Sequence, residues 1–274
     1  MKTIVQKYGG TSVSSIQKLK KIAEKIARDR VSGVNYLIVL SAMGDTTDKL
    51  VTLSNKVSKQ PNPRDYDMLL STGEQVSVAV LSMILNNINV NSISFTGWQA
   101  GIRTDSTSMM ARIEAINVKK IKSEFMKKNI VVVAGFQGVD DKDNITTLGR
   151  GGSDTTAVAL AAALKADECQ IYTDVDGVYT TDPRLCIKAR KLNKLTYEEM
   201  LEMAGLGSKV LQLRSVEFAS KHKVPIRVLN AHNIGSGTLI TKEEKKMEGA
   251  LISGIAFTKD EAEVMIRGVK DQPG

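Results

Sequence analysis

Short β-branched runs alternate with helical apolar patterns through most of this chain. The runs typical of strands lie at residues 4–5, 36–40, 93–95, 130–134, 169–173 and 226–229. Between the first two, apolar residues repeat at helical spacing from residue 16 to residue 26, and Thr11, Ser12 or Ser14 could cap that helix. Strands and helices in alternation predict an α/β domain built on a mainly parallel sheet.

Other helical patterns cover residues 47–57, 66–85, 111–128 and 154–165, and two more helices are expected between residues 196 and 221. Residues 60–63 have the composition of a surface turn, and residues 140–147 that of a hairpin. With 274 residues, of which 42% are hydrophobic, the chain is long enough for one large domain or two modest ones.

Composition also indicates where such a protein works. No apolar run reaches the roughly 18 to 20 residues of a membrane span, and the start lacks the apolar region and cleavage site of a signal peptide. We therefore expect a cytoplasmic protein with no membrane partner. Cys169 and Cys186 lie far from any CxxC spacing, with only His222 and His232 as possible co-ligands, so both thiols are expected to be reduced and to hold no zinc.

The net charge of +8 raises the possibility of a nucleic-acid partner. The basic residues, however, fall on segments that also carry helical apolar stripes, as at residues 18–25 and 119–128, which is typical of solvated helix faces. Aromatic residues make up only 4% of the chain and leave few platforms for stacked bases. We expect no nucleic-acid partner, and a positive field would also attract ATP.

A first glycine turn, KYGGTS at residues 7–12, follows a strand and precedes a helix. Adjacent glycines let an anion approach the backbone closely, and N–H groups at a helix start can face it. Lys7 would add a fixed positive charge of the kind that phosphoryl transfer uses. Glycine also punctuates ordinary strand-to-helix turns, so a plain turn is the alternative.

A second glycine turn, GRGGSD at residues 149–154, repeats this logic before an alanine-rich helix. Arg150 offers a planar fork for a carboxylate, and Asp154 at the helix start could orient lysines and a metal-bound phosphate. The alternative is that Ser153 and Asp154 only cap the helix.

A third motif, TDVDGVYTTDPR at residues 173–184, follows a strand and is too polar and too rich in Gly and Pro for a helix. It predicts a loop at the carboxyl end of the sheet, where open α/β folds bind ligands. A calcium loop fails on spacing, because Gly177 is the fourth residue from Asp174 and an EF-hand needs the sixth. A hairpin turn without a ligand is the alternative.

Other nucleotide-binding and hydrolytic classes lack support in the sequence. It has no GxxxxGK[ST] P-loop, no protein-kinase HRD or DFG motif, and no GxGxxG within a strand–helix unit. Both histidines lie late in the chain without an evident Ser or Cys partner. A carboxylate acceptor would need no general base, because its pKa near 4 leaves it ionised at neutral pH.

The motifs KYGGTSV at residues 7–13, STGE at 71–74, GRGGSD at 149–154 and TDVDGVYTTDPR at 173–184 resemble, in order and spacing, those of the aspartokinases of the amino-acid kinase superfamily. The resemblance implies a three-layer α/β/α sandwich with a mainly parallel central sheet. It also implies phosphorylation of the side-chain carboxylate of L-aspartate by ATP to give 4-phospho-L-aspartate, the first step towards lysine, threonine and methionine. Mg²⁺ would be held mainly by the nucleotide phosphates, with no metal site of the protein's own.

On this resemblance, Lys7, Asp154 and Lys209 are the expected catalytic residues, with Asp154 organising the two lysines rather than acting as a base. The ATP-binding residues would be Lys7, Tyr8, Gly9, Gly10, Thr173, Asp174, Tyr179, Pro183, Arg184, Lys209 and Val210. By residue type alone, Lys209 would be a plain surface lysine.

The expected aspartate-binding residues are Ser41, Thr47, Glu74, Phe136, Arg150, Gly151, Gly152 and Ser153. Arg150 would pair with a carboxylate, and Glu74 would accept hydrogen bonds from the ammonium group. Each has a plain alternative, such as a helix surface charge for Glu74, a core position for Phe136 and a helix cap for Thr47.

Residues 1–245 would form the kinase domain, and residues 246–274 a linker and the first strand of an incomplete ACT-type domain. The resemblance implies that the full-length form is a homo-oligomer and that its ACT region binds an amino-acid effector. A sister kinase with another acceptor, a silent ligand sensor and a basic nucleic-acid binder are the other hypotheses.

Overall fold

The computed structural model describes residues 1–208, 210–233, 235–242 and 254–256. Its main sheet has eight strands in the order β10-β12-β11-β9-β1-β2-β6-β3. Their bounds are β1 Lys2–Tyr8, β2 Val34–Leu40, β3 Ser92–Phe95, β6 Ile130–Ala134, β9 Glu168–Thr173, β10 Lys194–Thr196, β11 Ile226–Asn230 and β12 Thr238–Thr241. All neighbouring pairs are parallel except β11 and β12.

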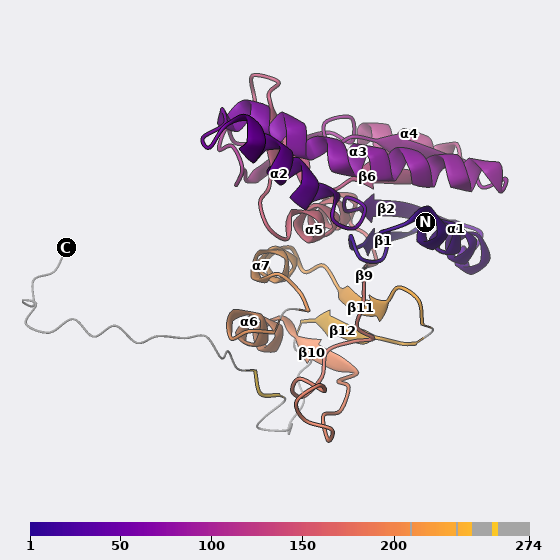
Figure 1. The fold of residues 1–274 in the computed structure, drawn as a ribbon. Coiled ribbons are helices and arrows are strands. Elements are labelled where there is room, and N and C mark those ends of the chain that lie inside the picture. Colours follow the sequence, from indigo (N-terminus) through magenta and orange to yellow (C-terminus); the bar gives the residue numbers. More distant parts are fainter. Residues whose placement is uncertain (209, 234, 243–253, 257–274) are drawn as a thin grey trace, which may run out of the picture.

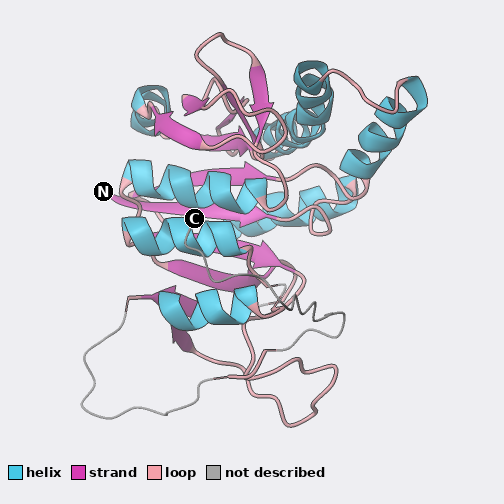
Figure 2. Ribbon diagram, turned by 90° about the vertical axis from the view of Figure 1, so that its left-hand side faces the viewer, coloured by secondary structure: helices cyan, strands magenta, loops and turns pink. Residues whose placement is uncertain are grey.

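Helices cover both faces of this sheet and make the expected three layers. On one face lie α4 (Lys119–Met126), α5 (Gly152–Leu164), α6 (Tyr197–Gly205) and α7 (Leu213–His222), and on the other lie α1 (Ile16–Asp29) and α3 (Pro63–Asn87). Figure 1 shows α5, α7 and α6 in a row along one side of the strands with α1 on the other, and Figure 2 looks onto the α5–α7–α6 side. Helix α2 (Thr46–Val57) packs against α3.

Alternation along the strands divides the apolar residues between two buried clusters. Val5 and Val39 face the α5 side, whereas Ile38 and Leu40 face α1 and α3. Fully burying one such side chain stabilises the fold by about 1.5–3 kcal/mol. A sheet buried on both faces requires continuous apolar strands, which is why residues 36–40 and 130–134 were recognisable as strands.

A second, four-stranded sheet was not predicted. Its order is β5-β4-β7-β8, with β4 Ile102–Thr104, β5 Ile113–Ile116, β7 Gln137–Val139 and β8 Ile145–Thr147. The antiparallel pairing of β7 and β8 confirms the predicted hairpin at residues 140–147. The helix expected at residues 111–128 is wrong in its first half, because residues 113–116 pair with β4 and only residues 119–126 are helical.

Two further expectations need correction. The N-cap of α1 is Ser15, whose hydroxyl accepts from the N–H of Lys18, and not Thr11, Ser12 or Ser14. Helix α3 is long and apolar enough to cross a membrane by length and composition, although the sequence suggested no such segment. Half of its apolar window is buried against the rest of the protein, as in the core helix of a globular domain.

The remaining predicted strands and helices lie where the sequence placed them, within a few residues at each end. Cys169 is buried and Cys186 half-buried, and both are free thiols. Residues 243–253 and 257–274 lie outside the described part of the chain, and with them most of the expected ACT-type segment, so the division at residue 245 stays a prediction.

Candidate active site

Five neighbouring parallel strands of the main sheet end along one edge, which we call the carboxyl edge. Strands β1, β2, β6, β9 and β11 stop there, and the chain continues through Gly9, Ser41, Gly135, Asp174 and Ala231. The loops that follow carry eight of the predicted site residues: Gly9, Gly10, Ser41, Phe136, Asp174, Tyr179, Pro183 and Arg184. Open α/β sheets bind their ligands at this edge.

Lys7 and Asp154 form an ion pair at the centre of the carboxyl edge. Lys7 lies near the end of β1 and Asp154 in the first turn of α5, and Lys7 Nζ is 2.7 Å from Asp154 Oδ1. Asp154 Oδ1 is buried, and this ion pair is its polar contact among the described residues. The two side chains are only 12% and 11% exposed, so little water screens their charges.

The first glycine turn places backbone donors beside this pair. Gly9 donates to the carbonyl of Tyr172, whereas the N–H groups of Gly10 and Thr11 have no acceptor in the described part of the chain. A Cβ on Gly9 would lie 3.5 Å from Lys7 Nζ, so the ammonium group lies directly above the turn. This combination of free N–H groups and a fixed cation suits a phosphate.

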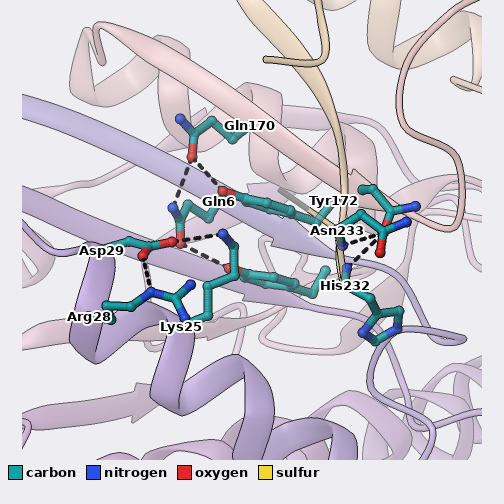
Figure 3. Close-up of polar contacts among 10 residues, drawn as sticks. Gln6, Lys25, Arg28, Asp29, Gln170, Tyr172, His232 and Asn233 are labelled. Atoms are coloured by element: carbon teal, nitrogen blue, oxygen red, sulfur yellow. Dashed lines mark hydrogen bonds and ion pairs between the residues drawn. The ribbon is translucent and has the colours of Figure 1, made fainter. Parts of the chain in front are cut away.

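The side chain of Tyr8 points away from this site. It is fully buried, stacks on Tyr172 with ring centroids 4.5 Å apart, and donates its hydroxyl to Gln6. Gln6 in turn donates to Gln170, and Figure 3 shows Gln6, Gln170 and Tyr172 in one polar band on the α1 side of the sheet. Only the backbone of Tyr8 is therefore available to a nucleotide.

A pocket of about 1230 Å³ opens beside the turn and gathers most of the predicted adenosine-side residues. Thr173, Asp174, Tyr179, Pro183, Arg184 and Val210 all line it. Arg184 forms a two-pronged ion pair with Asp182, and Tyr179 donates to Asp176. Lys209 lies outside the described residues, so its predicted role stays a prediction, although its neighbours Ser208 and Val210 also line the pocket.

The loop that forms this pocket is anchored by a residue that the sequence did not indicate. The hydroxyl of Thr238, in β12, accepts from the N–H of Val178 at 2.8 Å and donates to the carbonyl of Leu192 at 2.5 Å. Thr238 is fully buried and lies 60 residues beyond Val178 in the chain. No local motif marks such a contact.

In the second glycine turn, neighbouring atoms lie so close to the backbone that only glycine fits. Gly149 and Gly151 have φ angles of +75° and +70°, a region that favours glycine. A Cβ on Gly152 would lie 2.8 Å from Phe136 Cδ2, and one on Gly135 would lie 2.7 Å from Ser153 Oγ. The turn therefore brings Phe136 and Ser153, two of the residues predicted to bind aspartate, close together.

This turn does more than begin a helix. The N-cap of α5 is Gly151, which has no side chain to cap with, so Ser153 and Asp154 are not the caps of the alternative reading. The N–H groups of Arg150 and Gly151 find no acceptor among the described residues. Phe136 has a left-handed backbone, φ +70°, of the kind that concentrates at functional sites.

Arg150 and Glu74, both predicted to bind aspartate, have no ionic partner in the described part of the chain. Arg150 is exposed, and within the described ranges its side chain forms no ion pair. Glu74, in α3, is 3% exposed; its Oε1 accepts from the N–H of Ala42, and its Oε2 is buried with no hydrogen bond. Burial raises the pKa of Glu74 to about 7 from its ordinary 4.5.

Ser41 and Thr47 lie close to Glu74. Ser41 follows β2 and donates its N–H to the carbonyl of Tyr8, which ties it to the first glycine turn. A Cβ on Gly73 would lie 2.9 Å from Ala42 Cβ and 3.6 Å from Thr46 Cγ2, so the start of α2 packs directly on the residue before Glu74. Thr47 is in the first turn of that helix and does not cap it, because the N-cap is Asp45.

Two charged residues that the sequence did not indicate form hydrogen bonds with the chain just before the second glycine turn. Asp67, in α3, is fully buried and accepts from the hydroxyl of Thr147. Arg214, in α7, donates to the carbonyls of Leu148 and Ala111. Burial raises the pKa of Asp67 and lowers that of Arg214, because each charge is partly withdrawn from water.

The carboxyl edge thus offers two sets of free N–H groups, with the Lys7–Asp154 pair between them, a large pocket on one side and the Glu74 carboxyl group on the other. No group of three His, Cys, Asp or Glu side chains in the described ranges is arranged to hold a metal ion. The arrangement suits transfer of an anionic group between two bound molecules.

Comparison with known proteins agrees with this geometry. The sequence model of the amino acid kinase family matches residues 2–230. The chain is 58% identical to the aspartate kinase of Pseudomonas putida over 275 residues, which covers 100% of this chain and 67% of that protein.

Solved structures show the same fold. The aspartate kinase from Synechocystis superposes with a TM-score of 0.79 at 44% identity, covering 91% of this chain and 41% of that one. Aspartokinase III of E. coli, in complex with aspartate and ADP, superposes with a TM-score of 0.78 at 27% identity, covering 89% and 65%. The chain therefore belongs to the amino acid kinase family and, within that family, to the aspartate kinases.

Proposed function

We propose that this chain transfers the γ-phosphoryl group of ATP to the side-chain carboxylate of L-aspartate, giving ADP and 4-phospho-L-aspartate. The observation that carries the proposal is the buried Lys7–Asp154 ion pair, which lies between two glycine turns with free N–H groups. Charge spreads over the transferred oxygens in phosphoryl transfer, so fixed cations and oriented N–H groups supply most of the catalysis.

In this proposal, Lys7 and the first glycine turn hold the phosphates, and Asp154 fixes the direction of the Lys7 ammonium group. The nucleoside lies in the pocket lined by Thr173, Asp174 and Tyr179. Lys209 would reach the same nucleotide. The acceptor carboxylate is already ionised at neutral pH, so no residue has to remove a proton from it.

The charges of aspartate fit the remaining groups. Its ammonium group would donate to the buried Oε2 of Glu74, which has no hydrogen-bond partner in the described structure. A carboxylate would pair with the exposed guanidinium of Arg150 and with the free N–H groups beside it. Ser41, Thr47, Phe136 and Ser153 would complete the walls of this subsite.

Support for the two substrates comes from the relatives. Aspartokinase III of E. coli was solved with aspartate and ADP in an R-state, and with lysine and aspartate in a T-state. From these relatives we infer that the full-length form assembles as a homo-oligomer and binds an amino-acid effector in a region beyond residue 245. We also infer that the protein lies in the cytoplasm and catalyses the first step of lysine, threonine and methionine synthesis.

Mg²⁺ would accompany the nucleotide. It commonly keeps several waters and binds through substrate phosphates with one or two carboxylates, and Asp154 and Asp174 are the carboxylates beside the phosphate and nucleoside positions. Bound there, it would neutralise charge on the β- and γ-phosphates.

The test is acyl-phosphate formation. Incubating the protein with ATP, Mg²⁺, aspartate and hydroxylamine should yield aspartate hydroxamate and ADP in equal amounts. No hydroxamate above the aspartate-free control would overturn the proposal. Parallel reactions with glutamate and N-acetylglutamate would reveal a sister kinase, if either gave more hydroxamate than aspartate.

A further inference from the structure

Arg214 is a half-buried guanidinium that, among the described residues, binds main-chain oxygens instead of a carboxylate. It is the second residue of α7; its Nη1 donates to the carbonyl of Leu148 at 2.7 Å and its Nη2 to the carbonyl of Ala111 at 2.6 Å. Neither acceptor is close in sequence, since they lie 66 and 103 residues away. A planar fork with several fixed N–H groups is what allows one side chain to hold two carbonyls at once.

Leu148 is the residue on which the second glycine turn depends. It directly precedes Gly149, its N–H donates to the carbonyl of Phe136, and its side chain is buried under Gly152. A carbonyl fixed at Leu148 therefore fixes where the turn begins. Gln212, two residues before Arg214, covers the other end, because a Cβ on Gly151 would lie 2.2 Å from Gln212 Cγ.

The same stretch is held from the opposite face of the sheet. Asp67 accepts from the N–H of Met109 at 3.0 Å and from the hydroxyl of Thr147 at 2.6 Å. The N–H of Ala111 donates to the carbonyl of Thr147, which joins the two held segments. Asp67 of α3 and Arg214 of α7 thus form hydrogen bonds from opposite sides with neighbouring residues of the same two segments.

Glycine in the left-handed region gives the turn itself little intrinsic rigidity. The positions of Gly149 and Gly151 must then be set by contacts from outside, and Arg214 and Gln212 are the contacts from α7. Burial lowers the pKa of the Arg214 guanidinium. Hydrogen bonds in such partly buried surroundings are electrostatically stronger than in open water.

We propose that Arg214 is a positioning residue for the acceptor: through the carbonyl of Leu148 it sets the orientation of residues 149–152, and so the direction in which Arg150 presents its guanidinium to the acceptor's carboxylate. The proposal rests on the function proposed above, in which Arg150 binds that carboxylate. It adds a residue that acts on acceptor affinity from α7, a helix that carries none of the predicted aspartate-binding residues.

The test compares Arg214→Gln and Arg214→Lys with Arg112→Gln in the full chain. Arg112 is an exposed arginine next to Ala111, so its variant removes a nearby charge without touching either carbonyl contact. Arg214→Gln should raise KM for aspartate at least about tenfold, because small displacements of a binding group cost that much. KM for ATP should stay within about twofold, and Arg112→Gln should behave as wild type.

Arg214→Lys should fall between wild type and Arg214→Gln, since an ammonium group keeps the charge but not the fork. Amide hydrogen exchange gives a readout that needs no turnover: exchange in Arg214→Gln should quicken in peptides covering residues 109–112 and 147–152 and stay as in wild type elsewhere. An unchanged KM for aspartate, or an equal rise in both KM values with faster exchange throughout the chain, would overturn the proposal.

The exchange measurement also separates this inference from the proposed function. Wild-type protein that forms no acyl phosphate contradicts the proposed function alone. Unaltered exchange at residues 147–152 in Arg214→Gln contradicts the positioning role, whatever reaction the wild type catalyses.

Discussion

At the scale of single residues, the Lys7–Asp154 pair explains how a phosphate site can exist in a partly buried place. A cation there would be costly alone, and the adjacent carboxylate compensates its charge until an anion arrives. Asp154 also leaves Lys7 Nζ with donors to spare, since an ammonium group has three. The pair is thus suited to hold a phosphate without rearrangement.

Replacing Lys7 tests this role. Lys7→Ala should lower kcat by about 100-fold or more, because a charge that stabilises the transition state is lost. Lys20→Ala, which removes an exposed lysine of α1, should leave kcat unchanged. Steady-state kinetics decide the matter, with circular dichroism to check that Lys7→Ala is folded. A near-normal kcat in a folded Lys7→Ala variant would remove Lys7 from the mechanism.

Glu74 predicts a pH dependence of stability. Its folded pKa, about 7, is raised above the ordinary 4.5, so its contribution to stability is fully present below pH 4.5 and is lost as the pH rises through 7. Glu74→Gln cannot ionise and should escape this loss. Between pH 5 and pH 8, the free energy of unfolding of Glu74→Gln should rise relative to that of wild type by on the order of 3 kcal/mol.

Urea unfolding of ligand-free protein at several pH values measures this difference. Parallel curves for wild type and Glu74→Gln would show that the Glu74 carboxyl group is not held in a water-poor place. Added aspartate should reduce the difference, since its ammonium group favours the ionised carboxyl group.

At the scale of elements, the start of α5 is packed too closely for any side chain at Gly152. A Cβ there would meet Phe136 and Leu148 at 2.8 and 2.9 Å, whereas one on Gly205, at the end of α6, would meet nothing within 4 Å. Gly152→Ala should destabilise the protein by about 1–3 kcal/mol. Gly205→Ala should be neutral or stabilise by up to about 1 kcal/mol. Equal urea midpoints for the two variants would contradict the packing described.

The pocket loop offers a second prediction at this scale. Thr238→Val keeps the shape but removes the hydroxyl that holds Val178 and Leu192, so KM for ATP should rise about fivefold or more. Thr52→Val, which removes an exposed hydroxyl on α2, is the matched control. If both variants kept the wild-type KM for ATP, Thr238 would have no part in shaping the nucleotide pocket.

How far the sequence predicted the elements depends on their length and burial. Residues 130–134 are apolar throughout because both faces of β6 are covered, and that signal is unambiguous. Residues 113–116 form a short strand of the smaller sheet whose two isoleucines are only half-buried. These isoleucines fall by chance at helical spacing with Ile121. Only pairing with β4, which is not a local property, decides between the two.

The site residues likewise divide into those with a local sequence signal and those that depend on distant contacts. The glycine turns and the loop at residues 173–184 were recognisable because their chemistry is local: adjacent residues supply the donors and the charges. Thr238, Asp67 and Arg214 act on groups between 42 and 103 residues away, and as single residues each resembles an ordinary strand or helix position. Their roles follow from the folded chain alone.

At the scale of the whole molecule, strand order explains why distant motifs meet. Because β1 lies between β9 and β2, the turn after β1 has the nucleotide pocket on one side and Ser41 and Gly135 on the other. Helix α5 crosses beneath β1 and brings Asp154 to Lys7. In the proposed function, one sheet edge therefore orders donor, transferred group and acceptor in a line.

The central claim is that the protein transfers the γ-phosphoryl group of ATP to aspartate with Lys7 at the transferred group, and ³¹P NMR of the reaction mixture tests it most directly. With wild-type protein, ATP, Mg²⁺ and aspartate, an acyl-phosphate resonance should grow as the γ-phosphate resonance of ATP declines. It should be missing without aspartate and should grow at least about 100-fold more slowly with Lys7→Ala. Release of inorganic phosphate alone, or the same acyl-phosphate signal from Lys7→Ala, would contradict it.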